Sequence, residues 1–97
     1  MITVTSLLWI WRSEAAGAWY FLTIPEEQSG EIKAHALGVR RGFGSVRVEA
    51  TIGDVTWRTS LFPLNSGGYI LPVKKDVRRR AAISAGDEVT VAIELIA

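Results

Sequence analysis

The sequence predicts a mainly β fold: a small closed or split barrel of six strands with two short helices. Runs rich in β-branched and aromatic residues recur along the chain, and several alternate apolar with polar side chains. Gly, Pro and Asn interrupt these runs at short intervals, and only two stretches are typical of helices. The expected order is β-β-α-β-β-β-α-β in a single domain, residues 1–97. Two helices are too few to link parallel strands, which excludes a doubly wound α/β fold.

A hairpin is expected at the N-terminal end. We predict one strand over residues 2–12, a turn over 13–17 and a second strand over 18–24 that pairs with the first. The second strand carries apolar side chains at both odd and even positions. This pattern predicts burial on both of its faces.

The first helix is expected to begin at Pro25, which stops the strand because it has no N–H to donate and suits a first helical turn. Glu26 and Glu27 follow, where negative charge favours a helix N-terminus. Ile32 begins the apolar stripe of this helix, and Gly38 is expected to end the helix.

The middle of the chain predicts a second hairpin. Residues 45–52 and 55–62 alternate apolar with polar side chains, and residues 53–54, a Gly-Asp pair, suit a type II′ turn. A two-residue loop at that position places Glu49 opposite Arg58. An opposite-charge pair of this kind contributes a few tenths of a kcal/mol, on the order of 0.3 kcal/mol.

The last third predicts a short strand over residues 69–72, a helix over 73–82 and a final strand over 88–96. Pro72 limits the short strand to an edge or an end of the sheet. Basic residues lie in the last turn of the helix, which is the favourable end for cations.

Composition narrows the class of protein. The chain has no cysteine, so disulfides and thiolate chemistry are excluded. No basic stretch precedes the apolar run at residues 7–11, so we do not expect a signal peptide. That run is also far shorter than the ~20 residues that a spanning helix needs. We expect a soluble, cytoplasmic protein without a membrane partner.

Charge is unevenly distributed along the chain. Residues 33–80 carry a net charge of +7, whereas residues 1–32 and 81–97 each carry −3. Such asymmetry can indicate an anion-binding face. The alternative is that these charges only keep a small domain soluble.

Catalytic and metal sites are not expected. His35 is the single histidine, and without cysteine or a second histidine it offers neither a metal site nor a convincing triad. The nearby acidic residues are explained by their place in the first turns of a helix. The glycine-rich loop at residues 38–44 lacks the Lys-Ser/Thr ending of a Walker loop. We therefore expect no enzyme activity and no cofactor.

Basic residues of the loop and of the second helix form the candidate binding face. They are Arg40, Arg41, Lys74, Lys75, Arg78 and Arg79. Three aromatic residues close to the second helix in sequence are candidate pocket residues: Trp57, Phe62 and Tyr69. The alternative is that these aromatic residues belong to the core and that the basic face is only solvated. The chain has four tryptophans, and core packing is the commonest role of this residue type.

Several segments together resemble a known family. They are residues 19–25, 42–46, 57–63, 67–78 and 86–89, of which Ser-Leu-Phe-Pro (60–63) and Leu-Pro-Val-Lys-Lys (71–75) are the most specific. The chain resembles an uncharacterised bacterial family of domains of unknown function, about 100 residues long, sometimes fused to a bacteriocin-protection-type domain. The resemblance implies a split (double-split) β-barrel and no established activity.

A looser similarity involves residues 71–91, where Leu-Pro-Val, an arginine-bearing helix and Ala-Gly-Asp-Glu-Val follow one another. This order is similar to the swapped-hairpin module of AbrB-type regulators and antitoxins, which bind DNA as dimers. The chain departs from that module by its full N-terminal half and its single copy, which puts a two-fold DNA-reading surface in doubt.

The sequence thus favours a non-enzymatic binding module whose basic face receives an anionic small molecule or an acidic protein surface. The alternative is a nucleic-acid-binding domain, and the oligomeric state stays open.

Overall fold

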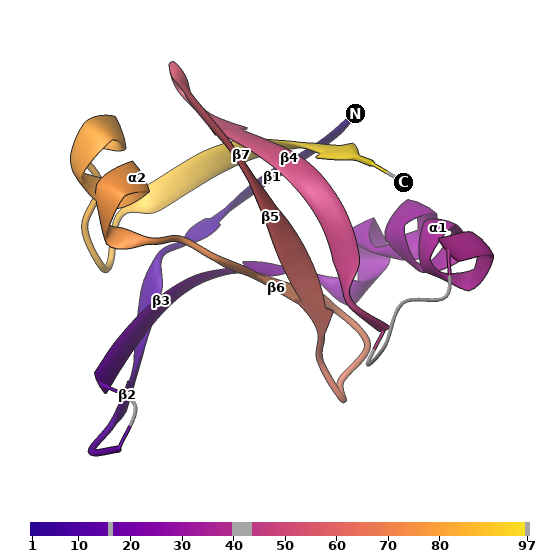
Figure 1. Ribbon diagram of the computed structural model, residues 1–97, viewed down its shortest axis with the longest axis horizontal. Helices are drawn as coiled ribbons and strands as arrows, with labels where there is room; N and C mark the ends of the chain where they lie inside the picture. Colours follow the sequence, from indigo (N-terminus) through magenta and orange to yellow (C-terminus); the bar gives the residue numbers. More distant parts are fainter. Residues whose placement is uncertain (16, 40–43, 97) are drawn as a thin grey trace.

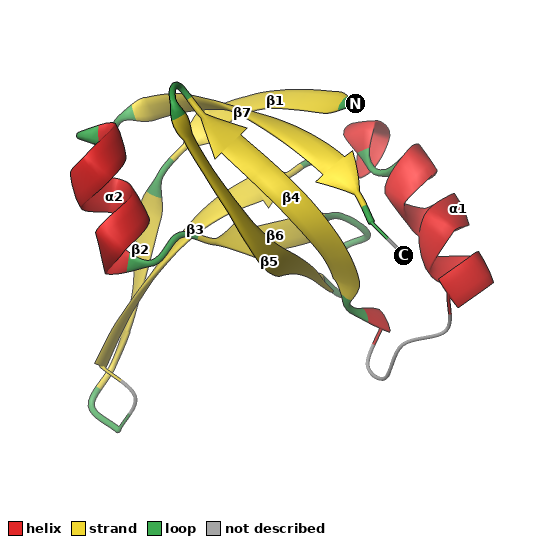
Figure 2. Cartoon of the chain, turned by 45° about the horizontal axis from the view of Figure 1, so that its top comes forward, coloured by secondary structure: helices red, strands yellow, loops and turns green. Residues whose placement is uncertain are grey.

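A computed structural model describes residues 1–15, 17–39 and 44–96. These residues form seven strands in one curved sheet, a half-barrel with a helix at each end (Figures 1 and 2). The strands are β1 (Ile2–Leu7), β2 (Trp9–Ser13), β3 (Gly17–Ile24), β4 (Val46–Ile52), β5 (Val55–Pro63), β6 (Tyr69–Pro72) and β7 (Glu88–Leu95). Their spatial order is β1-β7-β4-β5-β6-β3-β2. The predicted mainly β barrel-like fold with two helices is confirmed.

The segment expected as one N-terminal strand is two strands that separate at Leu8. β1 pairs with β7, from Ile2 opposite Ile93 to Leu7 opposite Glu88, whereas β2 pairs with β3 as the expected hairpin. Leu8 is 1% exposed, and its N–H donates to the Asp87 carbonyl at 3.0 Å. The Gly86 N–H donates to the Leu8 carbonyl at 2.7 Å. These bonds satisfy the backbone where the chain changes partners, so the expected six strands become seven.

The second predicted hairpin is confirmed in its register. Glu49 lies opposite Arg58, and their side chains approach to 3.5 Å. Gly53 has a φ of +58°, and it is the only residue of the two-residue turn with a positive φ. A positive φ at the first turn position alone is the pattern of a type II′ turn, which glycine adopts at little cost.

The helices close the two ends of the half-barrel (Figure 1). A 3₁₀ turn at Glu26–Gln28 follows Pro25, and the α-helix α1 (Gly30–Val39) begins after it. α1 includes Gly38, where the sequence had predicted its end. α2 spans Lys75–Ala81 and ends where Ala82 takes the left-handed conformation. No helix in the described parts of the chain is long and apolar enough to cross a membrane.

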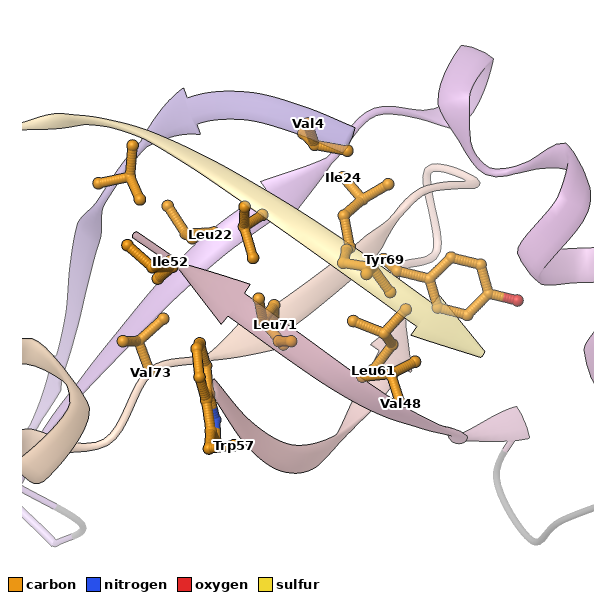
Figure 3. Close-up of a cluster of buried hydrophobic side chains, with 14 of the residues drawn as sticks. Val4, Leu22, Ile24, Val48, Ile52, Trp57, Leu61, Tyr69, Leu71 and Val73 are labelled. Atoms are coloured by element: carbon orange, nitrogen blue, oxygen red, sulfur yellow. The ribbon is translucent and has the colours of Figure 1, made fainter. Parts of the chain in front are cut away.

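The core lies on the concave side of the sheet. Alternate residues of β3 to β7 point into it, and Ile32 of α1 and Val77 of α2, both 0% exposed, cap its ends. Figure 3 shows Trp57 and Val73 at one end of this core and Tyr69 at the opposite end. Tyr69 is therefore distant from Val73, the residue that leads into α2, although the two residues are close in sequence.

Candidate ligand-binding grooves

A groove of about 460 Å³ occupies the open side of the half-barrel next to α2. It forms because β6 is short: β3 pairs with β6 only over residues 21–24, and β5 pairs with β6 only at Phe62 and Pro63. Beyond these residues the chain leaves β6 for α2. Residues 18–20 of β3 and 57–59 of β5 line the two sides of the groove, and residues 72–75 with Arg78 complete it. We call it the basic groove.

Four cationic side chains line the basic groove: Arg58, Lys74, Lys75 and Arg78. Arg58 is partly neutralised by Glu49 across the ladder. Lys74, Lys75 and Arg78 take part in none of the ion pairs that the described residues form. Three of the six basic residues expected from the sequence therefore line one concave site, and no carboxylate in the described parts of the chain pairs with them.

Arg78 is held in a fixed position. Its Nη1 donates to the Val73 carbonyl at 2.7 Å, and its guanidinium carbon lies 3.5 Å from the centre of the Tyr20 ring. Arginine has five N–H donors, so most of them stay available to a ligand. The side chain thus joins α2 to β3 and still presents positive charge to the groove.

The other expected basic residues do not join this site. Arg79 does not line the groove, is largely exposed and lies 3.9 Å from Asp76. Arg40 and Arg41 lie outside the described residues. The basic face expected from the sequence is therefore represented in the described structure by the groove alone.

The three candidate aromatic residues have different surroundings. Trp57 lines the basic groove and is also part of the core, with 8% of its surface exposed. Phe62 is 43% exposed on the convex face of the sheet. Tyr69 is buried at the far end of the core, and burial raises the pKa of its phenol above the ordinary value of 10.0. Tyr69 does not line the basic groove, and it lies at the opposite end of the core from Trp57 (Figure 3).

His35 lies on α1, at the end of the molecule opposite α2 (Figure 1). Its Nε2 is 3.3 Å from the Ile96 carbonyl oxygen. Over the residues that the structure describes, no three His, Asp or Glu side chains are grouped as metal ligands.

A second, apolar groove of about 530 Å³ lies on the convex face, where the sequence had suggested core residues. It is lined by Trp9, Trp11, Trp19, Phe21, Phe62, Ile70 and Pro72. The strand register explains this group, because Trp9 lies opposite Phe21 and Trp11 opposite Trp19, and cross-strand partners project from the same face. We call it the aromatic groove.

The expectation that β3 is buried on both faces is thus wrong. Leu22 and Ile24 face the core at 0% exposure, whereas Trp19 on the other face of β3 is 48% exposed. A chain of this length forms only one layer of core, so the second apolar face of β3 stays open to solvent. The aromatic residues at every second position, 9 and 11 on one strand and 19 and 21 on the next, are the signal that would have identified this face.

The aromatic rings are held in place by one another and by one hydrogen bond. Trp9 Nε1 donates to Thr23 Oγ1 at 2.9 Å, and the Trp9 and Phe21 ring centres are 5.1 Å apart. The Trp19 and Phe21 rings are nearly parallel, with an interplanar angle of 8° and centres 6.4 Å apart. These contacts hold Trp9, Phe21 and Trp19 together on one exposed face of the sheet.

Comparison with protein families matches residues 5–93 to a family described as "Domain of unknown function (DUF1905)". No curated protein matches the chain. The resemblance to a family of domains of unknown function, inferred from residue segments, is confirmed by this match.

Proposed function

Since the chain belongs to the DUF1905 family of domains of unknown function, we propose its function from the site: a non-enzymatic module that binds an anionic small molecule in the basic groove. One observation carries this proposal. Lys74, Lys75 and Arg78 converge on a single concave site, and none of them has a carboxylate partner among the described residues.

Electrostatics favours an anion at this place. Like charges that share a groove repel one another, and a bound anion relieves that repulsion while accepting charge-assisted hydrogen bonds. Trp57 and Tyr20 supply apolar walls beside the cations, and a lower local dielectric there strengthens each contact relative to bulk water. The volume of about 460 Å³ lies within the usual range for small-molecule sites, roughly 300–1,000 Å³.

We also propose that the protein is not an enzyme. The titratable side chains described in the groove are cations and a tyrosine, and neither a carboxylate nor an imidazole is among them to act as a general base. His35 lies at the other end of the molecule. The groove is therefore equipped to hold an anion rather than to transform it.

Nucleic acid is the second candidate, and the excess of positive charge in residues 33–80 is the observation in its favour. Against it, Arg79 and Arg80 both lie near Asp76, at 3.9 and 3.5 Å, which reduces the positive field outside the groove. An acidic segment of a partner protein would use the same cations as a small anion. The test below distinguishes nucleic acid and an acidic protein segment from a small anion.

The test is calorimetric and NMR titration with pyrophosphate at low and high salt. We expect saturable binding that weakens with salt and perturbs the signals of Lys74, Lys75 and Arg78. Combined Lys74→Gln and Lys75→Gln substitution should weaken binding by about tenfold or more, because each charge-assisted hydrogen bond is worth roughly 1.5–3 kcal/mol. Arg79→Gln is the matched control, since Arg79 does not line the groove.

Pyrophosphate that does not bind, or that binds equally well to the double variant, would overturn the proposal. DNA that binds with a steep salt dependence and loses affinity on Arg79→Glu substitution would favour the nucleic-acid alternative. An acidic peptide that binds to the groove more tightly than pyrophosphate would favour a protein partner.

A further inference from the structure

The basic groove and the aromatic groove are neighbours. Trp19 and Pro72 line both of them, the former from β3 and the latter from the end of β6. A ligand held by Lys74 and Arg78 therefore has an exposed aromatic surface directly beside it. Leu37 of α1 is also a large exposed apolar side chain, but it lines neither the basic groove nor the aromatic groove.

The aromatic groove is suited to a flat ring. Its walls are indole and phenyl rings with Ile70 and Pro72, and Trp19 already lies nearly parallel to Phe21. Trp19 leaves 48% of its surface in water. A ring that stacks on this surface removes it from water, and a stacked aromatic contact adds to the gain from burial alone.

From this juxtaposition we infer that the natural ligand is an aromatic anion: its charged group is held by Lys74, Lys75 and Arg78, and its ring system stacks on Trp19 in the aromatic groove. This inference rests on the proposed function and names the ligand class of the same site. An apolar groove alone does not select an occupant. The three cations beside it do, since they favour a ring that carries a carboxylate, sulfonate or phosphate over a neutral one.

The test uses three probes that separate ring from charge: naphthyl phosphate, naphthol and inorganic phosphate. Naphthyl phosphate should bind at least about tenfold more tightly than inorganic phosphate, because stacking of a base-sized ring on an aromatic side chain is worth about that factor or more. Naphthol should bind weakly, since it lacks the charged group. Only naphthyl phosphate should shift both the Trp19 indole N–H and the Lys75 signals.

Two variants locate the ring. Trp19→Ala should reduce the affinity for naphthyl phosphate to that for inorganic phosphate, which itself should not change. Leu37→Ala is the control, because it truncates an exposed apolar side chain outside both grooves. If Trp19→Ala does not fold, the shift of the Trp19 indole signal in the natural sequence decides the question.

The outcomes separate the inference from the proposed function. If inorganic phosphate binds but naphthyl phosphate gains nothing over it, the inference is wrong and the anion-binding function stands. An unmoved Trp19 indole signal at saturation with naphthyl phosphate leads to the same conclusion. If neither phosphate nor naphthyl phosphate binds, both the function and the inference fail.

Discussion

The guanidinium of Arg78 covers the ring of Tyr20 at 3.5 Å, and this contact joins α2 to β3 where the half-barrel opens. The Tyr20 carbonyl also accepts a hydrogen bond from the Val73 N–H at 2.9 Å, one residue beyond the paired part of β3 and β6. Arg78 in turn donates to the Val73 carbonyl. The three residues form the corner from which the basic groove extends, so its shape depends on them.

Arg78→Ala should lower the free energy of unfolding by about 1–3 kcal/mol, because it removes a cation–π contact and a charged hydrogen bond. Urea denaturation measures this loss. Arg79→Ala, on the exposed face of the same helix, should cost less than about 0.5 kcal/mol. Equal losses in the two variants would contradict a structural role for the Tyr20 contact.

Glu49 and Arg58 should be coupled only weakly. The two side chains are 3.5 Å apart, with Arg58 68% and Glu49 39% exposed, so solvent screens the pair. A double-mutant cycle with Glu49→Gln and Arg58→Gln should give about 0.3–0.5 kcal/mol. The coupling should decrease at high salt, because ions screen exposed charges. A coupling above about 1 kcal/mol that does not change with salt would mean that the pair is shielded from solvent, and it would contradict the exposure seen in the structure.

Gly68→Ala should destabilise the fold by about 1–3 kcal/mol. A Cβ atom at this buried position would collide with the Ile24 carbonyl oxygen, which is backbone and cannot move aside easily. Gly38→Ala is the matched control, since nothing lies near a Cβ there and the residue is helical. It should stabilise the protein by about 0.5–1 kcal/mol, and thermal denaturation of both variants measures the contrast.

Tyr69 should make stability fall in alkaline solution. Burial raises the pKa of its phenol in the folded state above 10.0, so above that pH the unfolded chain loses the proton first. The contribution is complete below pH 10.0 and decreases as pH rises toward the folded-state pKa. Tyr69→Phe should show a smaller decline in unfolding free energy across this range. Parallel pH profiles for the two proteins would refute the assignment.

The β4–β5 hairpin could be predicted to the residue because its information is local. Alternation fixed the inward faces, and the Gly53 turn set the register that places Glu49 opposite Arg58. The break at Leu8 could not be predicted in the same way. Residues on both sides of it favour strand, and only the carbonyl of Asp87 and the N–H of Gly86, distant in sequence, show where the chain changes partners.

The candidate site likewise has features that the local sequence determines and features that depend on the whole fold. Lys74, Lys75 and Arg78 lie together because they share one short helix and the residue before it. Phe62 and Tyr69 are only seven positions apart, yet Phe62 faces solvent and Tyr69 faces the core. The exposure of Trp11 and Trp19 depends on what covers the convex face, and that is a property of the whole fold.

Pairing of β1 with β7 has a consequence for the order of folding. Residues 2–7 pair with residues 88–93, so synthesis must reach the last of these residues before this ladder can close. Such distant contacts are slow to form, since a long loop has to be ordered first. Until then Val4 and its neighbours lack the partner strand that they have in the folded protein, and unpaired apolar strands of this kind are prone to aggregate.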